Sequence, residues 1–161
     1  MRRTDNEIKV TPSLLDRLID YEPKESRESP KSRSANLREL KLSVRRDLEF
    51  LLNSRSFPDE IPESLEELNK SVALYGLPDF TRSNVKNPSE QIKLTEQLES
   101  VIRIFEPRLM DLQITLDPVN DIERSLRFRI LAQLKVDPVP EPIAFDTILQ
   151  MGSGEFEVKE S

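Results

Sequence analysis

The sequence predicts an α+β fold in which helices come first and a small antiparallel or mixed sheet of three to four strands follows. Apolar residues recur at helical spacing up to Phe105, and after Arg108 they alternate with polar residues instead. The two patterns meet at a proline, Pro107, which cannot continue a helix. Helices grouped before strands are typical of the α+β class.

The composition restricts the chemistry open to the chain. It contains no cysteine and no histidine, which excludes disulfides, cysteine-ligated metals, thiol catalysis and histidine-based triads. With only 3 glycines, a glycine-rich phosphate loop or dinucleotide fingerprint is not expected. The acidic residues show neither EF-hand spacing nor a short catalytic signature. We therefore predict no metal, no cofactor, no catalytic residue and no enzymatic activity.

Charge and hydropathy indicate a location. The formal net charge of −6 argues against general nucleic-acid binding, which needs a basic surface. No segment approaches the roughly 20 apolar residues of a membrane-spanning helix. The charged N-terminus is not followed by the apolar run of a secretory signal. These patterns predict a cytoplasmic protein without direct membrane insertion.

Residues 1–35 are predicted to form an N-terminal helix and a flexible linker, ahead of a single α+β domain over residues 36–161. Thr11 and Pro12 suit the cap and first position of a helix over residues 11–20. Residues 22–35 are rich in serine, proline and charge, which predicts the linker. A helix this short is marginal alone, so its apolar stripe needs a surface in this protein or in a partner. The stripe consists of Leu14, Leu15, Leu18 and Ile19.

Three helices are predicted inside the domain. The first spans about residues 37–53, and the second is short, with Ser64 and Glu67 as a capping box. The third begins at Asn87 and ends before Pro107, because a proline disfavours the helical conformation of the preceding residue. Its predicted buried face contains Ile92, Thr95, Leu98, Ile102 and Phe105, widened by Leu94 and Val101.

Strands are predicted wherever apolar and polar residues alternate after Pro107. The first covers residues 112–116. The longest alternation, over residues 126–136, predicts one buried face and one basic, solvated face that carries Arg127 and Arg129. Further alternation predicts a strand over residues 145–151 and a short edge strand over residues 155–158.

The junction Glu106-Pro107-Arg108 has two readings. Pro107 can simply stop the helix while Glu106 and Arg108 form an internal ion pair. Alternatively, the rigid turn projects both charges toward a partner. A glutamate at a helix C-terminus opposes the helix dipole by a few tenths of a kcal/mol, so helix stability does not explain it. The residues alone leave both readings open.

Two motifs, Tyr75-Gly76-Leu77-Pro78-Asp79 and Glu106-Pro107-Arg108, lie in order with several less distinctive segments. Together they resemble the TssE family, the small baseplate subunits of bacterial type VI secretion systems. That family is similar to a lysozyme-like wedge protein of contractile phage baseplates. The other matching segments are residues 11–18, 42–53, 126–130, 140–147 and 154–156.

The resemblance implies a structural subunit of the baseplate, located where the baseplate docks to the inner-membrane complex. Its implied partners are the wedge and baseplate subunits TssF, TssG and TssK and the contractile TssB/TssC sheath. Glu106, Pro107 and Arg108 would then contact a wedge or sheath partner. The N-terminal helix would dock on a wedge protein through its apolar stripe. Arg127 and Arg129 would face an acidic partner, or simply a solvated sheet face.

Two other functions stay open. One is a peptidoglycan hydrolase related to lysozyme, although a shared fold does not imply a shared activity. The other is a generic cytoplasmic adaptor outside any secretion machine. Cell-wall zymography distinguishes the first from an assembly subunit, and co-purification with baseplate or sheath subunits distinguishes the second.

Overall fold

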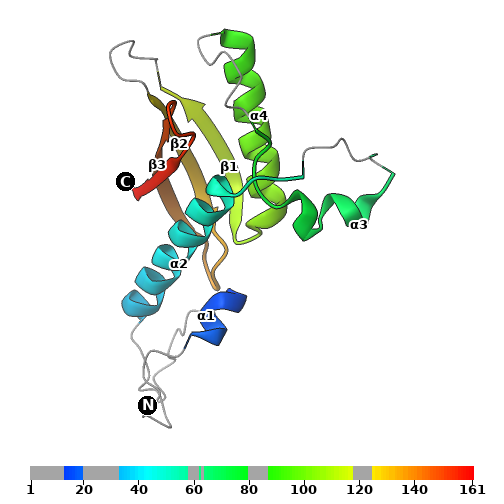
Figure 1. Cartoon of the computed structure of the whole chain (residues 1–161). Helices are drawn as coiled ribbons and strands as arrows, with labels where there is room; N and C mark the ends of the chain where they lie inside the picture. Colours follow the sequence, from blue (N-terminus) through cyan, green and yellow to red (C-terminus); the bar gives the residue numbers. More distant parts are fainter. Residues whose placement is uncertain (1–12, 20–32, 58–61, 63, 80–86, 118–124) are drawn as a thin grey trace, which may run out of the picture.

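The structure, a computed structural model, describes residues 13–19, 33–57, 62, 64–79, 87–117 and 125–161. Helices precede strands, as predicted (Figure 1). The helical elements are α1 (Leu14–Leu18), α2 (Arg33–Asn53), α3 (Glu66–Asn69), the 3₁₀ turn η1 (Val72–Leu74) and α4 (Pro88–Phe105). The strands are β1 (Leu109–Leu116), β2 (Ser125–Leu134), β3 (Glu141–Gln150) and β4 (Phe156–Glu160).

The four strands form one antiparallel sheet in the order β1-β2-β3-β4. Side chains of β2 alternate strictly between buried and exposed, so one face of the sheet is covered and the other is solvated. The helices cover the buried face: α2 packs against β4, and α4 packs against β1 (Figure 1). The fold is therefore a two-layer α+β arrangement, which confirms the predicted class.

The core lies between these two layers. Helix α2 contributes Val44, Leu48 and Leu52, all fully buried. Helix α4 contributes Leu94, Leu98 and Ile102. One residue of its predicted inner face is placed wrongly: Ile92 is 60% exposed, because the buried stripe runs through Leu94 on another side of the helix. The sheet adds Leu126, Phe128, Ile130, Leu134, Phe145, Leu149, Phe156 and Val158.

Three predicted helix starts differ from the structure. Ser13 caps α1 through its hydroxyl, which accepts from the backbone N–H of Asp16, while Thr11 and Pro12 lie outside the described residues. Helix α2 begins at Arg33, so the last three residues assigned to the linker are helical. Helix α3 has Leu65 at its cap with no side-chain hydrogen bond, so the predicted box from Ser64 is wrong.

The junction between α4 and β1 follows the sequence closely. Helix α4 starts at the predicted cap, where Asn87 accepts from the N–H of Ser89, and ends at Phe105. Glu106 is no longer helical, and its carbonyl accepts from the N–H of Leu109, which closes the turn into β1. Shortly afterwards Asp111 takes a positive φ of 52° at a bulge in β1.

The segment around Gly76 is fastened to the end of α2. The N–H of Leu77 donates to the carbonyl of Ser54 at 3.0 Å, and Leu77 is fully buried. Gly76 has φ +109°, and a Cβ there would lie 2.5 Å from the Ser54 oxygen. Only glycine fits this close approach. Tyr75 is thereby held edge-on against Phe105 of α4, with ring centroids 5.3 Å apart.

Candidate assembly site at the α4–β1 junction

Glu106 is buried at the junction, with only 4% of its surface exposed. Both of its carboxylate oxygens accept from Arg108: Nε donates to Oε1 at 2.6 Å and Nη2 to Oε2 at 2.5 Å. Such two-pronged pairing is the strongest geometry available to a carboxylate and a guanidinium. Pro107 lies between them with its ring exposed. The motif is therefore an internal ion pair between Glu106 and Arg108, with the exposed Pro107 between them in the chain.

Helix α2 supplies the next partners of Arg108. Its Nη2 donates to Oδ2 of Asp47 at 2.7 Å, and its Nη1 donates to the hydroxyl of Ser43 at 3.2 Å. Burial by itself would lower the pKa of Arg108, but the hydrogen bonds and charges of Glu106 and Asp47 outweigh it and raise the pKa. Arg108 therefore stays charged and ties the junction to α2.

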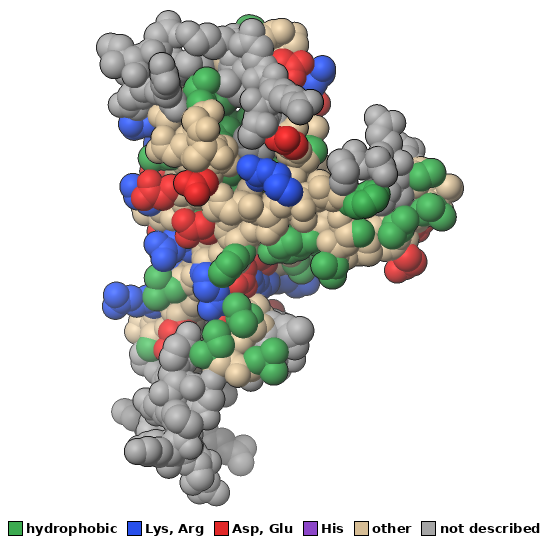
Figure 2. All heavy atoms as spheres, in the orientation of Figure 1, with side chains coloured by type: hydrophobic (Ala, Val, Ile, Leu, Met, Phe, Trp, Pro, Cys, Tyr) green, Lys and Arg blue, Asp and Glu red, His purple; other side chains and the backbone are tan. Residues whose placement is uncertain are grey.

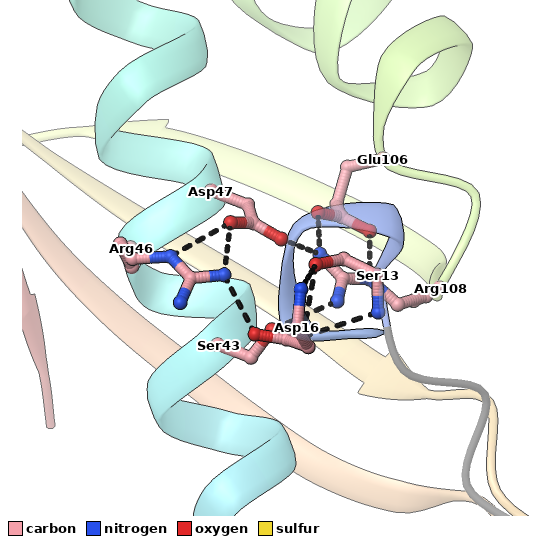
Figure 3. A network of polar contacts seen from close by, with 7 residues as sticks. All are labelled: Ser13, Asp16, Ser43, Arg46, Asp47, Glu106 and Arg108. Atoms are coloured by element: carbon pink, nitrogen blue, oxygen red, sulfur yellow. Dashed lines mark hydrogen bonds and ion pairs between the residues drawn. The ribbon is translucent and has the colours of Figure 1, made fainter. Parts of the chain in front are cut away.

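Helix α1 joins the same network through Asp16 (Figure 3). Arg46 donates from Nη2 to Oδ1 of Asp16 and to Oδ1 of Asp47, both at 2.8 Å, and the hydroxyl of Ser43 donates to the other oxygen of Asp16. Burial by itself would raise the pKa of Asp16, but the hydrogen bonds from Ser43, Arg46 and Ser13 lower it to about 2. Asp16 is thus ionised and joins α1 to α2.

The network links three separate parts of the chain by charge. The carboxylates of Asp16, Asp47 and Glu106 surround the guanidiniums of Arg46 and Arg108. Paired charges of this kind add little net stability compared with apolar residues. Removing one partner, however, leaves the other charge unpaired in a poorly solvated site. Their main effect is to fix α1, α2 and the junction in one relative position.

An apolar groove lies directly beside the network. Its volume is about 600 Å³ and its walls come from α1, α2, the segment around Gly76 and the junction. Phe50 is 59% exposed and Leu15 is 42% exposed, so the groove presents two large apolar side chains to solvent. Figure 2 shows hydrophobic side chains gathered around α1 and the neighbouring surface toward α3. The apolar lining consists of Leu15, Phe50, Leu51, Tyr75, Phe105 and Pro107.

Comparison with known families shows the family of the chain. The sequence profile of a family described as baseplate wedge protein gp25 matches residues 38–139, which is more than half of the chain. The chain belongs to the gp25 family of baseplate wedge proteins. This is the family to which TssE belongs, so the resemblance found in the sequence is confirmed. Searches of curated proteins and of solved structures gave no significant match.

Within this gp25-family chain, the predicted site residues fall into separate groups. Glu106 is not the surface residue that a direct partner contact requires, because its carboxylate is buried and fully occupied by Arg108. Pro107 is exposed at the rim of the groove. On α1, Leu18 is 74% exposed, Leu15 faces the groove and Ile19 is partly buried, whereas the side chain of Leu14 lies outside the described part.

Arg127 and Arg129 are not part of this site. Both lie on the solvated face of β2, on the side of the sheet away from the helices. Arg129 pairs with Asp146 of β3 at 3.1 Å, and the hydroxyl of Ser161 donates to the other oxygen of Asp146. The structure therefore gives Arg129 a cross-strand partner on the exposed sheet face.

Sequence reasoning missed the residues of α2 that complete the site. Ser43 and Asp47 are spaced by four residues and so lie on one helix face, and Ser43 is buried. A small hydroxyl and a carboxylate beside the buried apolar stripe of α2 are the signal that could have indicated an ionic partner. Phe50 was missed because the helical spacing of apolar residues indicates the buried face of α2 and does not single out an exposed residue.

Two further findings concern the described residues. They contain no helix with the length and apolar character needed to cross a membrane. They also contain no group of three or more cysteine, histidine or acidic side chains placed to hold a metal ion.

Proposed function

We propose that this gp25-family chain is the TssE-type subunit of a type VI secretion baseplate. It acts without enzymatic activity in the cytoplasm, where the baseplate docks to the inner-membrane complex. Its role is to join the wedge subunits TssF and TssG and the adaptor TssK to the TssB/TssC sheath. The observation that carries this proposal is the family match over residues 38–139. The ordered motifs described above point to the secretion-system branch of the family.

The groove is the surface proposed to contact the wedge. Its exposed apolar residues, Phe50 and Leu15, come from α2 and α1, and Pro107 completes the rim. An apolar patch with a polar border is typical of a protein-binding site. Glu106 and Arg108 then act indirectly, because they fix Pro107 and α2 in the positions that the wedge recognises.

The pairing of Glu106 also favours assembly over hydrolysis. A glycosidase needs one carboxylic acid that can donate a proton and a second carboxylate across the scissile bond. Both oxygens of Glu106 accept hydrogen bonds from Arg108 and the side chain is buried, so neither oxygen is free to approach a scissile bond. Cell-wall zymography with the purified chain is expected to show no clearing. Clearing that disappears in Glu106→Gln would overturn the assembly-only proposal.

Co-purification tests the wedge contact. In cells that produce the secretion system, Phe50→Asp should reduce recovery of TssF and TssG at least tenfold, because a carboxylate then enters an apolar interface. The matched control is Ile92→Asp, since Ile92 is equally exposed but lies on α4 about 20 Å along the helix from its C-terminal end. Equal recovery with both variants would contradict the groove as the wedge contact.

A further inference from the structure

Helix α3 and the 3₁₀ turn η1 form an arm that projects from the side of the molecule, away from the sheet (Figure 1). Neither element has a buried residue. Three large apolar side chains of the arm face solvent: Leu65 is 48% exposed, Leu68 is 40% exposed and Val72 is 87% exposed. None of the three belongs to the hydrophobic core of the described residues. The apolar character of the arm therefore does little for the fold itself.

The arm is nonetheless held in a defined position. At its base, the N–H of Phe57, which follows α2, donates to the carbonyl of Ala73 in η1 at 2.9 Å. At its far end, the side-chain amide of Asn69 donates to the carbonyls of Leu65 and Pro62 at 3.1 and 3.2 Å. Apolar side chains carried on a backbone that is already ordered require less ordering when a partner covers them.

The arm continues the apolar surface of the groove. Tyr75 lines the groove and directly follows η1. Figure 2 shows hydrophobic side chains from the surface beside α1 toward α3. The described walls of the groove come from helices, turns and the junction, with no strand edge among them. An occupant therefore binds through its side chains, as an amphipathic helix does when it lays its apolar face into a groove.

Charge indicates which helix fits the arm. Glu66 and Glu67 lie in the first turn of α3, both are exposed, and neither forms an ion pair within the described part of the chain. Lys70 is the one basic residue described on the arm. The carboxylates of the groove, by contrast, are already paired with Arg108. Like charges that meet across an interface cost energy, so the arm favours a basic partner over a second copy of itself.

We propose that the wedge segment in the groove is a basic amphipathic helix that extends over the α3 arm. Its apolar residues recur at spacings of three and four and cover Leu65 and Leu68. Its lysine or arginine side chains lie beside Glu66 and Glu67. This inference rests on the proposed wedge contact through Phe50 and adds the chemistry of the partner segment. The apolar contacts supply affinity, and the two carboxylates select the charge of the partner.

Binding of the full chain to purified TssF and TssG, at low and high salt, tests the charge of the partner. Glu66→Lys together with Glu67→Lys should weaken binding about tenfold at low salt and less at high salt, because salt screens exposed charges. The matched control is Glu96→Lys together with Glu155→Lys, which changes the net charge equally at exposed residues on α4 and before β4.

Equal binding by the two double variants would overturn the arm contact. If Phe50→Asp still weakens binding in that case, the groove remains the wedge contact without the arm. Failure of the unmodified chain to bind TssF and TssG would overturn both the arm contact and the proposed wedge contact. The charge reversals lie on exposed side chains, so the variants are expected to keep the thermal unfolding midpoint of the unmodified chain.

Site-directed cross-linking identifies the partner segment. The chain has no cysteine, so Ser64→Cys places a single thiol beside Leu65, where a thiol-to-amine reagent can reach a lysine of the partner. We expect a cross-linked TssF or TssG peptide with basic residues and with apolar residues at helical spacing. Ser89→Cys, exposed at the start of α4, should not capture this peptide. Capture of a peptide without that pattern would overturn the proposal, and a cross-link between two copies of this chain would show that a second copy covers the arm.

Discussion

At the scale of single residues, Glu106 is buried, yet it fixes the position of neighbouring residues that are exposed. It lies between α4 and β1, where its carboxylate binds Arg108 and is shielded from water. Arg108 in turn reaches Ser43 and Asp47 on α2. Of the two readings that the sequence left open, the burial of Glu106 and its pairing with Arg108 favour the internal ion pair.

Glu106→Gln should therefore lower the free energy of unfolding by about 3 kcal/mol, because it leaves part of the charge of Arg108 unbalanced in a poorly solvated site. Urea unfolding followed by circular dichroism measures this loss. The control is Glu99→Gln, which removes the exposed partner of Arg103 and should cost less than about 1 kcal/mol. Equal costs for the two variants would contradict the buried role of Glu106.

Gly76 provides a second prediction at this scale. Gly76→Ala should lower the free energy of unfolding by about 2 kcal/mol or more, because it combines a strained φ with a clash against the Ser54 backbone. Gly152→Ala is the matched control, since a Cβ there meets nothing within 4 Å. Thermal unfolding of both variants measures the difference. A loss confined to Gly152→Ala would contradict the close approach of Gly76 to Ser54.

Thr147 provides a third prediction at the scale of single residues. It is 1% exposed in β3, and its hydroxyl has no hydrogen-bond partner among the described residues. Thr147→Val should raise the free energy of unfolding by about 1 kcal/mol, because it replaces a buried, unpaired hydroxyl with a methyl group of similar shape. Chemical unfolding of the variant beside the unmodified chain measures the gain. A clear loss of stability would indicate that the hydroxyl is satisfied.

At the scale of elements, the carboxylate of Asp16 joins α1 to α2. Asp16 bonds to Ser43 and Arg46 of α2, while Leu18 remains exposed even when α1 is docked. Local patterns predicted α4 and β2 well, because capping at Asn87 and strict alternation are properties of neighbouring residues. The docking of α1 could not be predicted in this way, since Asp16 and Ser43 lie 27 residues apart and Arg108 and Ser43 lie 65 apart.

The docking of α1 on α2 through Asp16 should depend on pH. Its pKa is lowered from 3.8 to about 2 in the folded chain, so docking favours the ionised form. This contribution is fully present above about pH 4 and is lost as the pH falls toward 2. The amide resonance of Ile19, which donates to Leu15 within docked α1, should report the release in an NMR titration.

Asp16→Asn should show weaker docking of α1 at pH 7, with little change in the global unfolding midpoint, because α1 contributes no residue to the buried core among the residues described. Proteolysis within residues 13–19 should be faster in this variant than in the unmodified chain. Unchanged proteolysis, together with no pH response of the Ile19 amide between about pH 4 and 2 in the unmodified chain, would contradict the docking of α1 by ionised Asp16.

At the scale of the whole molecule, one groove brings separate parts of the chain to a single surface. The groove lies where α1, α2 and the α4–β1 junction meet. The charged network holds these elements together. A subunit built this way presents one apolar surface to a partner, as the proposed contact with the wedge requires.

A reconstruction of the assembled baseplate with the first sheath layer attached tests the proposed position most directly. We predict that the chain lies between the two, with Phe50 and Pro107 against a wedge subunit. A reconstruction in which the chain is absent from that position, or in which it touches neither the wedge nor the sheath, would contradict the proposal.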